Sequence, residues 1–167
     1  MTSITLLTEL QQILQTEITL HEQLLLHLQE EASGFGVLNG SELLRVQRSK
    51  ERCVEQIIKQ EEIRVALIAQ FPQHWPEQPP PFTLRVIIPL APPELGGALR
   101  QSFDQLQLLL ANIRELAENN GKESSVRLRS VEASMRFLTD SQQRQQPTYS
   151  GSGELQHSGN KVPRISV

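Results

Sequence analysis

The fold is decided by residues 94–138, which read ELGGALRQSFDQLQLLLANIRELAENNGKESSVRLRSVEASMRFL. Side chains recur along this stretch at alternating steps of four and three, the spacing that places them on one face of a helix. The stripe consists of Leu99, Phe103, Leu106, Leu110, Ile113, Ala117, Asn120, Ser124, Leu128, Val131, Met135 and Leu138. The spacing predicts a long amphipathic helix over 93–140, which bends or breaks near Gly121 because glycine destabilises a helix interior.

A first helix is predicted over 3–33, upstream of this stretch. Its apolar stripe runs through Leu7, Leu10, Leu14, Ile18, Leu25, Leu28 and Ala32, with His21 filling one position. Glu17 and Glu22 are expected to flank this stripe on the solvent side. Thr2 and Ser3 are suitable N-capping residues, and the glycines of 34–36 end the helix.

A second helix is predicted over 41–71, between the glycine turn and Pro72. Its stripe runs through Leu43, Val46, Lys50, Cys53, Ile57, Arg64 and Ile68. Lys50 and Arg64 interrupt an otherwise apolar line, so each must pair with an acid or reach solvent at the edge of the helix. Cys53 is the single cysteine, which excludes an internal disulfide, and its place on the stripe predicts a buried thiol.

The remaining segments differ in composition from the three helices. Residues 72–93 are rich in proline and form a linker with a short helical turn over 84–88, which Trp75, Phe82 and Ile87 pack onto the bundle. Residues 142–167 are mostly polar and are expected to be a disordered tail. The predicted fold is therefore all-α: a helical domain over 1–141, built as an antiparallel bundle or coiled coil of three long helices, followed by the tail.

Composition and motifs exclude several classes of function. The chain lacks the spacings of phosphate-binding loops, nucleophile elbows and zinc-binding helices, so it is expected not to be an enzyme and to use no metal or cofactor. Its net charge of −3 argues against nucleic-acid binding. No apolar run is long enough to span a membrane, which predicts a cytoplasmic protein without membrane insertion.

Two features of the third helix leave alternatives open. Asn120 lies on the apolar stripe, where it either fixes helix register through a buried hydrogen bond or makes a polar contact with a partner. Val131, Met135 and Leu138 belong to an apolar face near the helix end. That face is either bundle core or an end that extends past the other helices and binds a partner helix.

Several motifs resemble the FlgN family of flagellar type III export chaperones. The run Leu116–Gly121 looks like the family's L-x-x-x-N-x motif, and Leu128-x-x-Val131 and Met135-x-x-Leu138 resemble its repeated apolar positions. Pro147-Thr148-Tyr149-x-x-x-Gly153 is similar to its tail motif. The sequence departs from the family's pattern at Gly121 and Ser124-Ser125, the region where the third helix is expected to bend or break.

The resemblance implies a function and a set of binding residues. FlgN-like proteins are cytosolic chaperones for the hook-associated proteins FlgK and FlgL, whose C-terminal helical segments they hold unassembled before secretion. The implied partner-binding residues are Asn120, Leu128, Val131, Met135, Leu138 and Tyr149, with Tyr149 the counterpart of a tail tyrosine associated with export-gate components. The alternative is a structural coiled-coil protein that forms a homo-oligomer through the same stripe.

Overall fold

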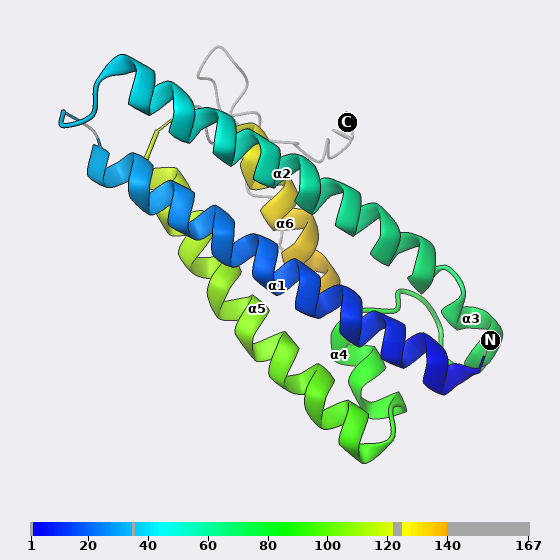
Figure 1. Cartoon of the computed structure of the whole chain (residues 1–167). Coiled ribbons are helices and arrows are strands. Elements are labelled where there is room, and N and C mark those ends of the chain that lie inside the picture. The colour runs from blue at the N-terminus through cyan, green and yellow to red at the C-terminus, as the bar shows by residue number, and fades with distance from the viewer. Residues whose placement is uncertain (1, 35, 122–124, 140–167) are drawn as a thin grey trace, which may run out of the picture.

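Figure 1 shows the computed structural model of the chain, which describes residues 2–34, 36–121 and 125–139. For residues 125–129 it describes the backbone but not the side chains. Within these residues all regular structure is helical, which confirms the predicted all-α class. Four helices form the body of the molecule: α1 (Ser3–Gly34), α2 (Gly40–Ile68), α5 (Pro93–Asn119) and α6 (Ser125–Thr139). The connection between α2 and α5 contains α3 (Phe71–His74), α4 (Leu84–Ile87) and the short 3₁₀ helix η1 (Ile88–Leu90).

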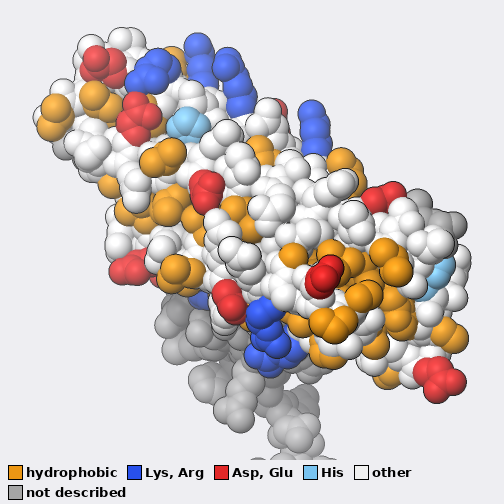
Figure 2. Space-filling view, turned by 60° about the horizontal axis from the view of Figure 1, so that its bottom comes forward, with side chains coloured by type: hydrophobic (Ala, Val, Ile, Leu, Met, Phe, Trp, Pro, Cys, Tyr) orange, Lys and Arg blue, Asp and Glu red, His pale blue; other side chains and the backbone are white. Residues whose placement is uncertain are grey.

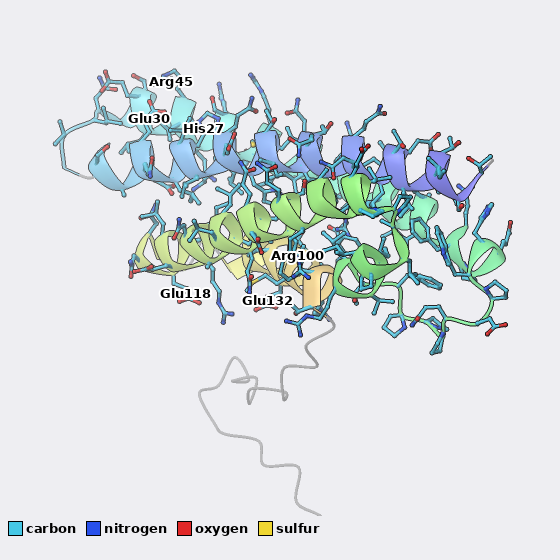
Figure 3. All side chains as sticks on the ribbon, turned by 90° about the horizontal axis from the view of Figure 1, so that it is seen from below. His27, Glu30, Arg45, Arg100, Glu118 and Glu132 are labelled. Atoms are coloured by element: carbon cyan, nitrogen blue, oxygen red, sulfur yellow. The ribbon has the colours of Figure 1, made fainter. Side chains whose placement is uncertain are left out.

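Helices α1 and α2 form an antiparallel pair joined by the glycine turn. Near the turn, Arg45 Nη2 donates to Glu30 Oε1 at 2.7 Å (Figure 3). Further along, Arg64 Nε donates to Glu17 Oε1 at 2.8 Å, so residue numbers rise along α2 as they fall along α1. Cys53 lies on the buried face between these contacts, as predicted.

The start of α2 is fixed by a capping box at Asn39. The Asn39 side chain accepts a hydrogen bond from Glu42 N at 3.0 Å, and Asn39 N donates to Glu42 Oε2 at 2.9 Å. These two bonds satisfy amide groups that have no partner within the helix. Asn39→Ala is therefore expected to lower the free energy of unfolding by about 1 kcal/mol. Urea denaturation followed by circular dichroism measures the loss, and an unchanged midpoint would contradict it; Asn112→Ala, on the exposed surface of α5, is the matched control.

The proline-rich connection returns the chain to the end of the bundle where α1 begins. Phe71 is buried, its ring stacks on Trp75 with centroids 5.1 Å apart, and Phe82 approaches it at 5.8 Å. Phe82 and Ile87 are buried in the core and Trp75 packs against it, as the sequence predicted.

This return makes α1 and α5 parallel rather than antiparallel. Ser102, early in α5, accepts hydrogen bonds from Gln11 and Gln15 of α1, whereas Asn120, just past the end of α5, donates to Leu28 O of α1. The predicted antiparallel arrangement therefore holds for α1 with α2 and not for α1 with α5. Figure 1 shows both directions, because α1 and α5 leave the same end of the bundle.

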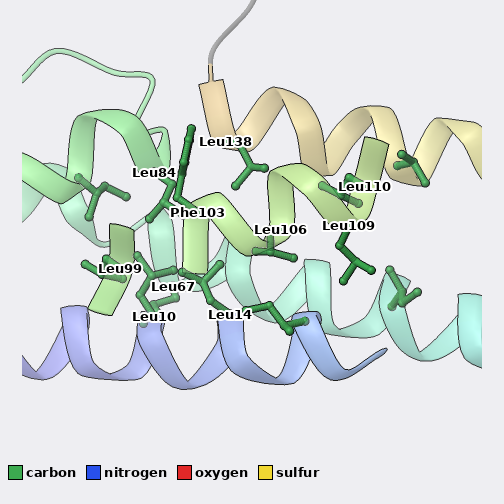
Figure 4. Close-up of a cluster of buried hydrophobic side chains, with 14 of the residues drawn as sticks. Leu10, Leu14, Leu67, Leu84, Leu99, Phe103, Leu106, Leu109, Leu110 and Leu138 are labelled. Carbon is green, nitrogen blue, oxygen red and sulfur yellow. The ribbon is translucent and has the colours of Figure 1, made fainter. Parts of the chain in front are cut away.

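The core is a line of aliphatic side chains from α1, α2, α4, α5 and α6 (Figure 4). Buried members in that view are Leu10, Leu14, Leu67, Leu84, Leu99, Phe103, Leu106, Leu109, Leu110 and Leu138. Leu138 of α6 lies among residues of α4 and α5, so the last described helix contributes to the same core as the first three long helices.

The predicted third helix breaks near Gly121, as the glycine predicts, and forms two helices. α5 ends at Asn119, Gly121 adopts a φ of +101° that favours glycine, and α6 runs back along the bundle. α6 packs against α5, α4 and α2. Of the two alternatives for the apolar face near the end of this helix, the structure shows bundle core rather than an end that extends past its partners, because the chain reverses and covers the face itself.

Candidate functional site

The interface between α6 and the rest of the bundle is the candidate site, because it contains the apolar face that the sequence singled out. Val131 and Leu138 are only 3% and 2% exposed, and Met135 and Phe137 pack against the core. Spacings of three and four residues bring Val131, Met135 and Leu138 to one side of α6, and the structure turns that side inward. The surface of α2, α4 and α5 that receives them is called the α6 groove below.

Two of the six predicted binding residues lie outside what can be placed in this site. The side chain of Leu128 and all of Tyr149 fall outside the described residues. Their assignment to partner binding stays a prediction.

Asn120 lies at the junction of α5 and α6 and bonds to α1. Its Nδ2 atom donates to Leu28 O and to Glu31 Oε2, both at 3.0 Å. Glu31 also accepts a hydrogen bond from the buried Lys50 of α2, so one carboxylate connects three segments of the bundle. Of the two alternatives for Asn120, these bonds favour the register lock, since they fix the end of α5 immediately before the reversal.

A buried polar cluster lies between α1 and α2 and extends to α6. Glu17 is 3% exposed and pairs with Arg64, which is 2% exposed. The expectation that Glu17 lies on the solvent side is therefore wrong. The strict alternation of steps through Leu10, Leu14, Glu17 and His21 would have placed it on the buried stripe, and that spacing is the signal that was missed. Arg64 pairs with an acid, one of the two outcomes that its position predicted.

The guanidinium of Arg64 is also the point where this cluster contacts α6. Its Cζ atom lies 4.0 Å from the centre of the Phe137 ring, within the range of a cation–π contact. Arg64 Nη2 is buried without a hydrogen-bond partner among the described residues, and Oε1 of Glu61 lies 3.9 Å from it. The ring therefore packs against a guanidinium whose Nη2 arm has no hydrogen-bond acceptor among the described residues.

Burial shifts the pKa values of Glu17 and His21, which lie beside Arg64. Desolvation raises the pKa of Glu17 above 4.5, although the charge and hydrogen bond of Arg64 oppose the shift. Desolvation lowers the pKa of His21 below 6.5, and the positive charge of Arg64 adds to this effect. His21 Nδ1 lies 2.6 Å from Glu17 O, while His21 Nε2 is buried without a partner among the described residues. Protonation would place a second unpaired N–H group in the cluster.

His21 should make stability depend on pH. A histidine with a lowered folded-state pKa contributes stability that is present above its unfolded value of 6.5 and lost as the pH falls below it. Between pH 7 and pH 5 the contribution of His21 to the free energy of unfolding should fall, by at most about 1.4 kcal/mol per pH unit. Glu17 contributes in the opposite direction. The quantity to measure is therefore the slope of the free energy of unfolding against pH, obtained from urea titrations, in wild type and in His21→Leu. Equal slopes would contradict the assignment.

The rest of the described surface carries scattered apolar side chains. The large exposed ones are Ile4, Leu26, Val37, Leu44, Ile58, Ile63, Val65 and Leu108. Figure 2 shows hydrophobic side chains among polar ones on one face, with a denser group toward the end of the bundle that holds the N-terminus in Figure 1. Scattered apolar side chains are ordinary on a folded protein, whereas the α6 groove is a face that another part of the same chain has to cover.

Comparison with known protein families now decides the class of protein. The sequence matches the FlgN protein family over residues 1–157. The chain belongs to the FlgN family. FlgN proteins are flagellar export chaperones and not enzymes, so this member acts as a chaperone in flagellar protein export. No curated protein and no solved structure matches the sequence.

Among the helices that the structure describes, none is both long enough and apolar enough to cross a membrane.

Proposed function

We propose that this FlgN-family chaperone holds the C-terminal helical segment of FlgK or FlgL in the α6 groove, and that α6 occupies the groove when no client is bound. The observation that carries the proposal is the burial of Val131 and Leu138 against α2, α4 and α5. The groove holds an amphipathic helix, α6. In helix-in-groove binding, apolar side chains on one face of the bound helix enter the groove, and Val131 and Leu138 have the spacing that this requires.

Three features of α6 suit it to leave the groove. It contains 15 residues, and an isolated helix of that length is marginally stable in water, so its structure depends on docking. Gly121 lies between α5 and α6, and apart from its chain neighbours no described residue comes within 4 Å of the position that a Cβ atom would occupy there. The hydrogen bonds of Asn120 hold the end of α5 on α1, so α6 can move while the bundle of α1, α2 and α5 stays in place.

Client binding in this form gives new roles to the predicted binding residues. Val131, Met135 and Leu138 occupy the positions that client side chains would take, and they reach a partner only after α6 leaves the groove. Leu128 and Tyr149 keep the roles proposed from the resemblance, with Tyr149 contacting export-gate components. The protein would act in the cytoplasm, where its clients await export.

The mechanism is physical rather than chemical. A client terminus that would otherwise assemble buries its apolar stripe in the groove, and export requires that it can leave again. Dissociation constants from micromolar to nanomolar, corresponding to about −8 to −12 kcal/mol, meet both requirements.

Light scattering and calorimetry of the purified chain with a C-terminal fragment of FlgK or FlgL test this proposal. We expect the mass of a complex and a dissociation constant in the range above, with a negative heat-capacity change from apolar burial. A homo-oligomer whose mass depends on protein concentration and ignores the fragment would instead support the self-associating scaffold.

A further inference from the structure

The α6 groove contains a buried hydrogen-bond donor, on Arg64, for which α6 supplies no described acceptor. Arg64 is buried, and its Nε atom donates a hydrogen bond to the carboxylate of Glu17. The half-buried ring of Phe137 covers the guanidinium, and Nη2 has no acceptor among the described residues. A buried donor without an acceptor is costly, and a ring face replaces an oxygen acceptor poorly.

A helix that replaces α6 could satisfy this donor. In the docked state the centre of the Phe137 ring lies 4.0 Å from Cζ of the guanidinium. The N–H groups of Nη2 lie in the plane of the guanidinium, so a side chain of similar reach that ends in an oxygen would accept one of them from the edge of that plane. The incoming helix would then make a hydrogen bond that α6 does not make, and this difference favours exchange.

We propose that Arg64 is a specificity-determining residue of the groove and that it binds the carboxamide oxygen of an Asn or Gln side chain on the client helix, at the position that Phe137 holds in the free protein. The inference rests on the proposed function, because it assumes that the client replaces α6. It means that the groove selects a client helix by one carboxamide side chain as well as by its apolar side chains.

The charges around Arg64 favour a carboxamide over a carboxylate. Glu17 already pairs with Arg64 at 2.8 Å, and Glu61 lies 3.9 Å away. A client carboxylate would be a further buried negative charge with no cation left to balance it. The raised pKa of Glu17 agrees with a cluster in which even one carboxylate is costly to bury.

The first test needs no client, because α6 itself can present the acceptor. Phe137→Gln and Phe137→Leu are compared in the full chain with Arg64 and in Arg64→Lys, which keeps a positive charge for Glu17 but lacks the second N–H arm. With Arg64, the urea midpoint of Phe137→Gln should exceed that of Phe137→Leu; in Arg64→Lys, Phe137→Leu should be the more stable. The same preference for Leu in both backgrounds would overturn the proposal.

Two further measurements cover the remaining outcomes of this test. If Arg64→Lys does not fold, NMR of the Arg64 guanidinium in the Phe137 variants replaces the stability comparison. The Nη hydrogens should exchange with solvent at least about tenfold more slowly in Phe137→Gln than in Phe137→Leu, because a hydrogen-bonded hydrogen is protected from exchange. Equal exchange would overturn the inference. Phe137→Glu serves as the carboxylate arm, and greater stability than Phe137→Gln would overturn the choice of a carboxamide.

The second test uses the FlgK or FlgL C-terminal fragment. Phe137→Gln strengthens the hold of α6 on the groove, so the fragment should bind this variant about tenfold more weakly than Phe137→Leu. Replacing one Asn or Gln of the fragment by Leu should weaken binding to the wild-type chain by a similar factor and leave binding to Arg64→Lys unchanged. Equal affinities throughout would overturn the role of Arg64. Failure of the fragment to bind any variant would contradict the proposed function, while the stability comparison would still decide whether Arg64 accepts a carboxamide.

Discussion

Leu138→Asp is expected to strengthen the binding of a FlgK or FlgL C-terminal fragment by about thirtyfold. Leu138 is buried between α6 and the groove, so an aspartate there removes the apolar contact and would bury a charge. α6 should therefore leave the groove. If docking of α6 stabilises the closed state by about 2 kcal/mol, the groove is open in only a few per cent of the free molecules. The apparent affinity for the fragment is lower than the intrinsic affinity by that fraction, and a variant in which α6 is undocked regains the difference.

Calorimetric titration measures this change, and circular dichroism checks that helix loss is confined to the 15 residues of α6. The matched control is Leu108→Asp, which replaces a leucine that is 66% exposed on α5 and should leave affinity unchanged. Loss of binding in Leu138→Asp, with the bundle still helical, would contradict competition by α6. It would mean that the apolar face of α6 itself contacts the client.

The sequence predicted the helical elements well because their stripes are long and regular. The 3.6-residue period is a local property, and it marks α1 and α2 without reference to the rest of the chain. Lys50 and Arg64 were identified as residues that must pair or reach solvent, and both pair with acids of α1. Cys53 was placed on the buried face by the same period.

The reversal at Gly121 could not be read from the same pattern. α5 and α6 share a continuous stripe in sequence, since the steps of three and four continue across the break. A stripe that continues through a turn looks like one long helix, although the positive φ of Gly121 sends α6 back along the bundle. The periodicity therefore identified the apolar face of Val131, Met135 and Leu138 but did not show that the chain itself covers it.

The direction of α5 relative to α1 and the pairing of Glu17 with Arg64 also could not be predicted from the spacing of residues along the sequence. Whether α5 runs parallel or antiparallel to α1 depends on how residues 71–92 cross the end of the bundle, and this is set by tertiary contacts of Phe71 and Phe82. Glu17 was placed in solvent because acids are usually exposed. Its partner lies 47 positions away in sequence, so only the fold brings the two together.

The Glu17–Arg64 pair leads to the prediction with the largest effect on stability. Both side chains are almost fully buried, so removing either partner leaves the other without its main counter-charge. Glu17→Leu and Arg64→Met should each lower the free energy of unfolding by about 3–5 kcal/mol. The double variant Glu17→Leu/Arg64→Met should recover most of this loss, because two apolar side chains of similar size need no counter-charge. Urea denaturation of the four proteins gives the coupling between the two sites.

The pH dependence of the single variants distinguishes a charge effect from a packing effect. In Arg64→Met the remaining unpaired group is Glu17, whose pKa burial already raises, and loss of Arg64 removes the two influences that oppose that rise. A raised folded-state pKa means that stability is lost as the pH rises through it, so the deficit of Arg64→Met relative to wild type should shrink from pH 7 to pH 5. In Glu17→Leu the remaining group is an arginine, which stays charged throughout this range, so no such recovery is expected. Deficits independent of pH in both variants, together with additive effects in the double variant, would show that the pair acts through packing alone.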